Sequence, residues 1–249
     1  MFERIIEFST HEDYYSSLQE EEFPTPIKLN IPEWYKKLEH KHGEMTVKGC
    51  MPFLDTLTTG YLLKVPQDIF IDHNVLNQKQ EPDSFSSFAL RDFEHQFRAK
   101  GINLNTGGEL HTPKQIEGSP FLEKNKNFPI YKIMNPWVIK TPKGYSCLFV
   151  PPLNNNDDRF SIISGIVDTD TYNLEINFPF VINGDKYPQL NTVIKTGTPY
   201  VQIIPFKRES WKIKTKKITQ KKILNNKLFF FKSLLHNYKN KCWNKKIWK

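Results

Sequence analysis

Two carboxylates near the middle of the chain have the spacing and setting for chemistry. Asp168 and Asp170 are separated only by Thr169 and follow the apolar run 165–167. A carboxylate at the end of a strand can bind a metal ion or act as a general base. The same Asp-Thr-Asp pattern also caps hairpins, because aspartate side chains accept hydrogen bonds from nearby backbone amides. The sequence leaves both interpretations open.

Short apolar runs interrupted by proline, glycine and asparagine surround these carboxylates. Aromatic residues make up 14% of the 249 residues, and there are 17 prolines and 11 glycines. This composition favours strands and turns over long helices, so we expect a mainly β fold. A short N-terminal helix is expected over 32–38, because proline favours the first turn of a helix. Strands are expected over 61–65, 69–71, 145–150, 160–167 and 200–204.

The charge is distributed unevenly along the chain. The net charge is +8, but the segment 207–249 holds 15 Lys or Arg residues against one acid, Glu209. This segment therefore carries +14, and the residues before it carry −6. We expect a β-rich globular domain over 1–211 and a basic helical tail over 212–249. Such asymmetry indicates a tail that contacts phosphate, an anionic surface or the acidic body itself.

Apolar residues in the tail recur every three or four positions. This spacing predicts an amphipathic helix of about five turns, with an apolar seam made of Leu224, Leu228, Phe231, Leu235, Tyr238 and Cys242. A basic amphipathic helix can bind an anionic membrane, nucleic-acid phosphate or a partner helix. The seam can also pack on the chain's own body or on a second copy. We expect the tail to contact a protein partner or to mediate self-association.

The cysteines and the N-terminus bear on the compartment and on metal binding. Cys50, Cys147 and Cys242 are far apart and odd in number, which argues against a disulfide framework and a thiolate metal cluster. The N-terminus has acids where a signal peptide has basic residues, and no run approaches 18 apolar residues. We expect a cytoplasmic protein with reduced thiols, without a metal site and without a cofactor.

Four motifs resemble, in their order, the β-clip fold of trimeric dUTP pyrophosphatases and dCTP deaminases. They are TGYL at 59–62, PKGY at 142–145, GIVDTDTY at 165–172 and GTPYVQII at 197–204. The resemblance implies a β-clip-like distorted β-barrel or sandwich with its core in 46–72 and 128–208. It also implies a possible homotrimer.

The same resemblance implies a set of site residues. In that family the first acid of the hairpin positions the attacking water, and a tyrosine packs against the deoxyribose. Asp168 matches this acid, and Asp170 is the second candidate catalytic residue. Tyr172 matches the tyrosine with a displacement of one residue. Tyr61 and Gln202 lie in two further matching motifs, and with Tyr172 they are the candidate ligand-binding residues.

The segment that binds phosphate in that family departs from the family pattern. Its Pro-Arg-Ser-Gly sequence is Pro-Pro-Leu-Asn here, at 151–154, without the cation and the hydroxyl. Triphosphate hydrolysis needs cations or backbone amides on the phosphates and usually Mg²⁺. We therefore expect a non-catalytic accessory or structural interaction protein. The alternatives are a divergent nucleotide hydrolase that uses Asp168 with Mg²⁺, and a module that binds a nucleotide without cleaving it.

The whole chain resembles more closely a family of proteins in tailed phages of marine bacteria, of the myophage type, with relatives in bacteria. The matching stretches are 31–38, 50–61, 141–154, 164–180 and 197–211. This resemblance implies a phage-related origin and transfers no activity. It places the protein in the cytoplasm of an infected bacterial host or in the virion.

Overall fold

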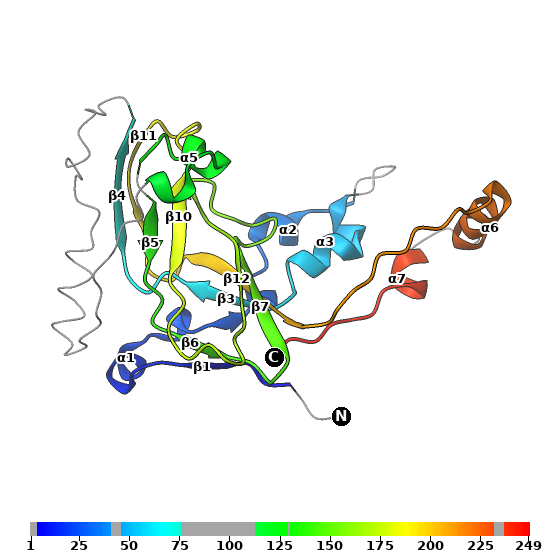
Figure 1. Ribbon diagram of the computed structural model, residues 1–249, viewed down its shortest axis with the longest axis horizontal. Helices are drawn as coiled ribbons and strands as arrows, with labels where there is room; N and C mark the ends of the chain where they lie inside the picture. The colour runs from blue at the N-terminus through cyan, green and yellow to red at the C-terminus, as the bar shows by residue number, and fades with distance from the viewer. Residues whose placement is uncertain (1–3, 41–45, 76–112, 129, 232–236) are drawn as a thin grey trace. The chain divides into compact units, whose positions relative to one another are not determined.

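The computed structural model describes residues 4–40, 46–75, 113–128, 130–231 and 237–249 (Figure 1). The chain divides into two compact units. Unit 1 comprises Met1–Thr25 and Gly60–Lys207, and unit 2 comprises Pro26–Thr59 and Arg208–Lys249. The segment expected as a separate tail after residue 211 therefore shares a unit with a segment from the first quarter of the chain.

The mainly β prediction is confirmed. The described chain contains β1 (Glu7–Ser9), β2 (Thr25–Pro26), β3 (Tyr61–Lys64), β4 (Ile69–Asn74), β5 (Tyr131–Ile133), β6 (Val138–Lys140), β7 (Tyr145–Val150), β8 (Phe160–Ile162), β9 (Gly165–Val167), β10 (Phe178–Ile182), β11 (Gln189–Ile194) and β12 (Pro199–Lys207). The alternation of buried and exposed residues in β4 is typical of a strand with one face on the core.

The largest sheet has the strand order β2-β3-β12-β7-β9. β12 pairs on both edges, with Gln202 opposite Leu62 of β3 and opposite Val150 of β7. β9 is antiparallel to β7, with Val167 opposite Cys147. Three smaller sheets have the orders β5-β10-β8, β11-β4 and β1-β6. None of these sheets closes into a barrel within the described strands, so the β-clip geometry stays a prediction.

The expected strand over 160–167 is two strands in two different sheets. β8 pairs with β10, while β9 pairs with β7, and Ile163 and Ser164 lie between them. The continuous apolar pattern of the sequence did not show this break. Because the chain passes from one sheet to another here, β8 and β9 pair with different strands instead of forming one long strand.

Unit 1 has a core of aromatic and branched aliphatic side chains from all four sheets. The rings of Phe178 and Tyr200 meet edge to face at 5.6 Å, and those of Phe160 and Phe180 at 5.7 Å. Such pairs contribute about 1 kcal/mol beyond the burial of apolar area. Further buried members of this core are Leu63, Val65, Ile71, Ile133, Ile139, Phe149, Ile162, Ile182, Ile194, Val201 and Ile203.

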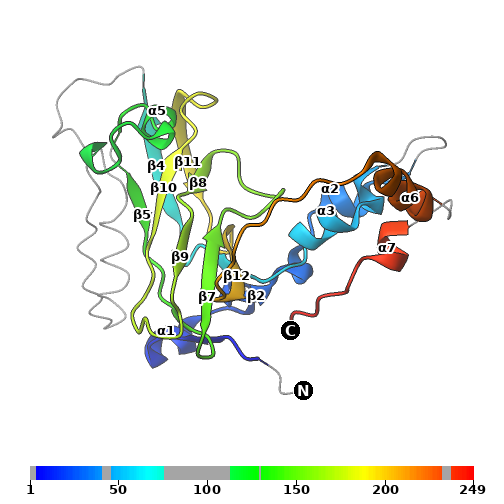
Figure 2. The same ribbon diagram turned by 45° about the vertical axis from the view of Figure 1, so that its right-hand side comes forward.

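Short helices lie at the ends of unit 1. α1 (Glu12–Ser17) begins with Glu12 and Asp13, whose charges favour a helix N-terminus, and it buries Tyr14. α5 (Pro120–Lys124) begins with Pro120 after the capping residue Ser119. Within this unit α1 and α5 lie at opposite ends of the strands in both ribbon views (Figure 2). Short 3-10 turns cover Glu20–Glu22 and Pro113–Ile116 in unit 1.

Unit 2 is helical in its described part. The helix expected over 32–38 is confirmed as α2 (Glu33–Lys37), which is followed by α3 (Met51–Thr56). The rings of Tyr35 and Phe53 stack with their centroids 5.9 Å apart and join these two helices. The C-terminal segment contributes α6 (Gln220–Phe231) and α7 (Asn237–Lys241). The remaining 3-10 turns are Ile27–Asn30 and Val47–Gly49.

The tail therefore forms helices in the region where the seam was expected, but those seam side chains that the structure describes are exposed. Leu224 and Leu228 are each 55% exposed, and Tyr238 is 42% exposed. Leu235 lies outside the described residues. That the seam contacts a protein partner or a second copy of this chain stays a prediction.

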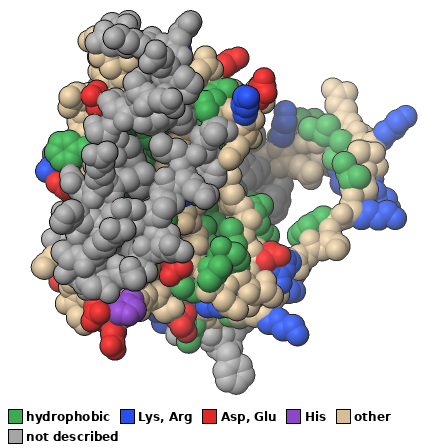
Figure 3. All heavy atoms as spheres, turned by 60° about the vertical axis from the view of Figure 1, so that its left-hand side comes forward, with side chains coloured by type: hydrophobic (Ala, Val, Ile, Leu, Met, Phe, Trp, Pro, Cys, Tyr) green, Lys and Arg blue, Asp and Glu red, His purple; other side chains and the backbone are tan. Residues whose placement is uncertain are grey.

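The two units have opposite charge. Unit 2 contains 19 Lys and Arg residues and 5 Asp and Glu residues, so it carries +14 and unit 1 carries −6 of the chain's +8. In the space-filling view, Asp and Glu side chains lie at several places on the described part of the face, with a histidine among them near its lower edge (Figure 3). The net positive charge of the protein thus comes from unit 2.

We expect Gly60→Ala to destabilise unit 1 strongly. Gly60 has φ +84°, and a Cβ atom there would lie 2.0 Å from the backbone oxygen of Ile203 in β12. Because backbone atoms of a central strand cannot move aside, the loss of unfolding free energy should be about 3 kcal/mol or more. Urea unfolding measures it.

Gly144→Ala is the matched control for this substitution. Gly144 has φ +85°, but no atom lies within 4 Å of its added Cβ. Only the left-handed backbone then opposes alanine, at about 1 kcal/mol. Equal losses for the two variants would contradict the close approach of Gly60 to β12.

Candidate functional site

The two candidate catalytic carboxylates accept hydrogen bonds from a neighbouring turn. The Ser146 hydroxyl donates to Asp168 Oδ1 at 2.6 Å, and the backbone amide of Gly144 donates to Asp170 Oδ2 at 2.8 Å. Both donors belong to the turn between β6 and β7 and to the start of β7. The side chains of the Asp-Thr-Asp turn therefore connect the segment after β9 to the turn between β6 and β7 and to the start of β7.

The residue between the two carboxylates is buried in the same contact. Thr169 is 0% exposed, and its hydroxyl lies 2.7 Å from that of Thr141 and 3.3 Å from the Sγ of Cys147. Burial raises the pKa of the Cys147 thiol to about 11, and the hydrogen bond from Thr169 lowers it slightly. At neutral pH this thiol is protonated and unreactive. The centre of the acidic turn is thus a packed structural contact.

The structure places Tyr172 in the same turn as the carboxylates. Its backbone amide donates to the carbonyl oxygen of Asp168 at 2.9 Å, as does the amide of Thr171 at 3.0 Å. The side chains of Asp168 and Tyr172 are both exposed. These two candidate residues therefore lie next to each other at the surface, and a backbone hydrogen bond between them forms part of the turn.

Gln202 lies elsewhere. Its side chain is 0% exposed, and its Oε1 accepts a hydrogen bond from the amide of Leu153 at 2.8 Å. Ser146, the partner of Asp168, is opposite Phe206 of β12. Four residues of strand between Gln202 and Phe206 span about 13 Å. Gln202 thus holds the loop after β7, far from the acidic turn.

Tyr61 is a half-buried residue at the start of β3. It is opposite Ile203 of β12, and its ring meets Phe8 edge to face at 5.8 Å. Burial, and secondarily the nearby Cys147, raises the pKa of its hydroxyl. The structure therefore brings Asp168, Asp170 and Tyr172 together in one turn. Tyr61 lies on β3, and Gln202 lies on β12.

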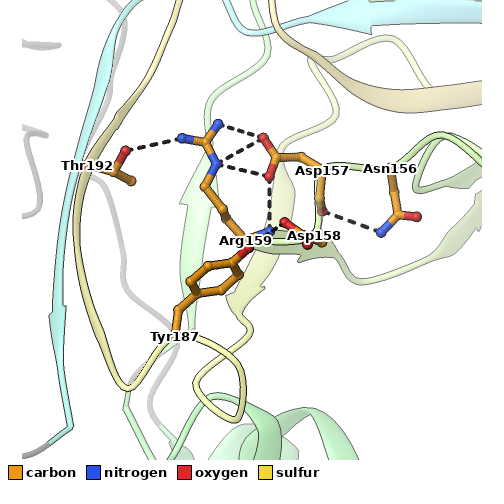
Figure 4. Close-up of polar contacts among 6 residues, drawn as sticks. All are labelled: Asn156, Asp157, Asp158, Arg159, Tyr187 and Thr192. Atoms are coloured by element: carbon orange, nitrogen blue, oxygen red, sulfur yellow. Dashed lines mark hydrogen bonds and ion pairs between the residues drawn. The ribbon is translucent and has the colours of Figure 1, made fainter. Parts of the chain in front are cut away.

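A second polar cluster was not predicted from the sequence. The guanidinium of Arg159 forms a bidentate pair with Asp157, at 2.6 Å to Oδ2, and donates to the Thr192 hydroxyl at 3.1 Å (Figure 4). The hydrogen bonds with Asp157 raise the pKa of the Arg159 guanidinium. Asp157 and Arg159 are 17% and 27% exposed, so the pair is only partly solvated.

The neighbouring carboxylate of this cluster joins the same loop to the turn between β10 and β11. Asp158 pairs with Lys186 and accepts a hydrogen bond from the Tyr187 hydroxyl at 2.7 Å. These two bonds lower the pKa of Asp158, the one from Lys186 more strongly. The cluster thus links the loop 151–159 to β11 and to the turn before it. The sequence could not reveal these links, because Thr192, Lys186 and Tyr187 lie about thirty positions from their partners in the loop.

A buried histidine lies on β4. His73 is 0% exposed, its Nδ1 lies 3.5 Å from the Tyr131 hydroxyl, and its ring centroid is 4.4 Å from that of Phe128. Its Nε2 has no hydrogen-bond partner in the part of the chain that the structure describes. Burial lowers the pKa of His73 to about 4, so its ring is neutral at physiological pH.

In unit 2 a single carboxylate holds the C-terminal segment. Asp55 of α3 accepts hydrogen bonds from the Trp243 indole at 3.1 Å to each oxygen and from Lys246 Nζ at 2.6 Å. The Asp55 side chain is 20% exposed. The ammonium group of Lys246 also lies 5.9 Å from the centre of the Trp243 ring. The tail thus contacts an acidic residue of its own chain, through residues outside the expected seam.

No three His, Cys, Asp or Glu side chains are grouped to hold a metal ion in the described residues. No helix there is long and apolar enough to cross a membrane. No family model matches the chain, and no curated protein matches it. The resemblances to β-clip enzymes and to phage proteins therefore stay predictions.

We expect the stability of unit 1 to fall at mildly acidic pH because of His73. Its pKa is near 6.5 in the unfolded chain and about 4 in the folded protein, so the unfolded state binds more protons between these values. The contribution is complete above pH 6.5 and is lost as the pH falls to 4, with a slope on the order of 1 kcal/mol per pH unit. Urea unfolding at several pH values measures it.

His73→Phe keeps an aromatic ring and removes the titration, so its slope in this window should be smaller. An identical slope in wild type and His73→Phe would show that other groups cause the pH dependence.

We expect Asp55→Ala to release the C-terminal segment of unit 2. The substitution removes the acceptor of the Trp243 indole and of Lys246. Trypsin should then cleave after Lys245 and Lys246 several times faster, because proteolysis follows the population of the opened segment. Mass spectrometry of the C-terminal peptides follows the cleavage.

Glu33→Ala is the matched control, since it removes an exposed ion pair with Lys36 within α2. Such exposed pairs contribute little to stability. If both variants are cleaved at the wild-type rate, Asp55 does not hold the tail.

Proposed function

We propose that the protein is a non-catalytic interaction protein of phage-related origin, with unit 1 as a β-clip-like scaffold and the basic segment of unit 2 as its contact element. The observation that carries this proposal is the use of Asp168 and Asp170. Both carboxylates accept hydrogen bonds that join the segment after β9 to the turn between β6 and β7 and to the start of β7. A carboxylate used in this way contributes to the fold without any substrate.

The loop that matches the phosphate-binding segment supports the same conclusion. Pro151 and Pro152 have no backbone N–H, and the amide of Leu153 donates to Gln202. Phosphate groups are held by cations or by clusters of backbone amides. Three of the four amide positions at 151–154 therefore have no donor to offer a triphosphate.

The charge of the protein supports a contact role for unit 2. Its excess of 14 positive charges is opposite in sign to the −6 of unit 1. A strong single-sign charge accelerates association with an oppositely charged partner and strengthens it at low salt. Assembly as a homotrimer and location in the infected host's cytoplasm or in the virion are parts of this proposal that rest on the sequence resemblances.

A nucleotide screen tests the proposal. We expect no phosphate release from any nucleoside triphosphate with Mg²⁺, and no shift of the melting temperature, because the phosphate donors are missing. Asp168→Asn should lower the melting temperature by a few degrees by weakening the bond from Ser146. Asp170→Asn is the control in the same turn. It should lower the melting temperature by a similar amount, because the amide of Gly144 also loses a charged acceptor.

Two results would contradict the proposal. If the wild type hydrolyses a nucleotide, and Asp168→Asn abolishes this activity while Asp170→Asn retains it, the protein is a nucleotide hydrolase that uses Asp168. A thermal shift with a nucleotide but without turnover would favour a nucleotide-binding module in the same fold.

A further inference from the structure

We infer that residues 208–228, here named the basic arm, bind single-stranded nucleic acid. The inference rests on the contact role proposed for unit 2 and identifies the class of partner. The basic arm begins directly after β12 and contains an extended segment, 208–219, followed by most of α6. Figure 1 shows the extended segment as a long orange trace that leads into α6.

The basic arm presents its charge to solvent. Every side chain from 208 to 228 is exposed, and the arm contains eight Lys or Arg residues against one acid, Glu209. Within the described structure its lysines form no ion pair with a carboxylate, whereas the cations of unit 1 at 126, 159, 186 and 195 all do. Exposed, unneutralised lysines attract phosphate and release its counterions on binding.

The lysines of the extended segment have a regular spacing. Lys212, Lys214 and Lys216 occupy alternate positions. In an extended chain, alternate residues point to the same side at intervals of about 6.6 Å. The three ammonium groups can therefore follow the backbone of one nucleic-acid strand, each near a different phosphate.

An aromatic side chain stands beside this row of lysines. Trp211 is 89% exposed and precedes Lys212. It has no ring partner or hydrogen bond among the described residues, in contrast with Trp137, Trp34 and Trp243. An exposed aromatic ring next to cations is the platform on which an unpaired base stacks. A duplex hides the faces of its bases, so this arrangement favours a single strand.

The helical half of the arm argues against a membrane surface as the partner. An interfacial helix needs an apolar face separated from its charged face. In α6, Lys227 follows Leu224 by three positions and Ile223 by four, so it lies on the same face as these apolar residues. The mixed face suits phosphate contacts with the lysines and local apolar contacts with bases.

Fluorescence anisotropy with the full chain and a labelled oligothymidylate of about 30 nucleotides tests the inference. We expect binding at about 50 mM salt that weakens steeply towards 200 mM. Lys212→Gln/Lys214→Gln should weaken binding about tenfold and reduce the slope of log K against log salt by about 1.4, because each single-strand phosphate contact contributes about 0.7. Trp211→Ala should weaken binding about tenfold through the lost stacking, and Trp211→Phe much less.

Matched controls separate the arm from general charge and from general loss of an aromatic ring. Lys114→Gln/Lys143→Gln removes two exposed lysines of unit 1, and Trp34→Ala removes a 47% exposed tryptophan elsewhere in unit 2. Both should bind within about twofold of wild type. The arm variants and the double lysine variant of unit 1 should retain the wild-type melting temperature, because the substituted side chains are exposed. Trp34→Ala should lower it, because it removes ring contacts with Tyr35 and Phe53.

Three results would overturn the inference. The first is that the oligonucleotide does not bind at low salt. The second is that a duplex of the same length binds equally well or more tightly. The third is that the protein binds vesicles of anionic lipid and not the oligonucleotide. If the oligonucleotide is not bound while the nucleotide screen still shows no turnover, only the class of partner is wrong. Nucleotide turnover in that screen would contradict the proposed non-catalytic function, whichever partner the basic arm binds.

Discussion

Backbone pairing on both edges of β12 connects most of unit 1. β12 is antiparallel to β3 on one edge and to β7 on the other, and its residues 200–203 are buried. The close approach of Gly60 to Ile203 lets the chain enter β3 beside this strand. β7 in turn carries β9 and, through Ser146, the Asp-Thr-Asp turn. The position of the candidate carboxylates thus depends on the central strand.

The same dependence explains why an acidic turn with the residue types of an active site can be structural. Two carboxylates one residue apart repel each other and need donors nearby. In this protein the donors are a hydroxyl at the start of β7 and a backbone amide in the turn before β7. Thr169, between the two carboxylates, is buried. The turn stays exposed on its outer side at Asp168 and Tyr172, which is where a ligand would have to bind.

The division of charge between the units gives the protein two surfaces with different chemistry. In unit 1, carboxylates and cations neutralise one another in compact clusters such as Asp157–Arg159 and Asp158–Lys186. In unit 2, one such contact, at Asp55, holds the C-terminal segment, and the excess lysines before it remain exposed. A surface that is not neutralised internally is available for a partner, which links the fold to the proposed contact role.

The sequence by itself determined the mainly β class, strands over 61–65, 145–150 and 200–204 that match β3, β7 and β12 within a few residues, the short helix α2, and the basic excess of the C-terminal segment. These properties follow from local composition, alternation and charge, which are readable along the chain. Only the tertiary structure decided the break between β8 and β9, the hydrogen bonds of Asp168 and Asp170, the separation of Gln202 from them, and the contact of Trp243 with Asp55. Each of these depends on which distant segments lie side by side, and contacts between segments that are tens to nearly two hundred residues apart leave no local pattern in the sequence.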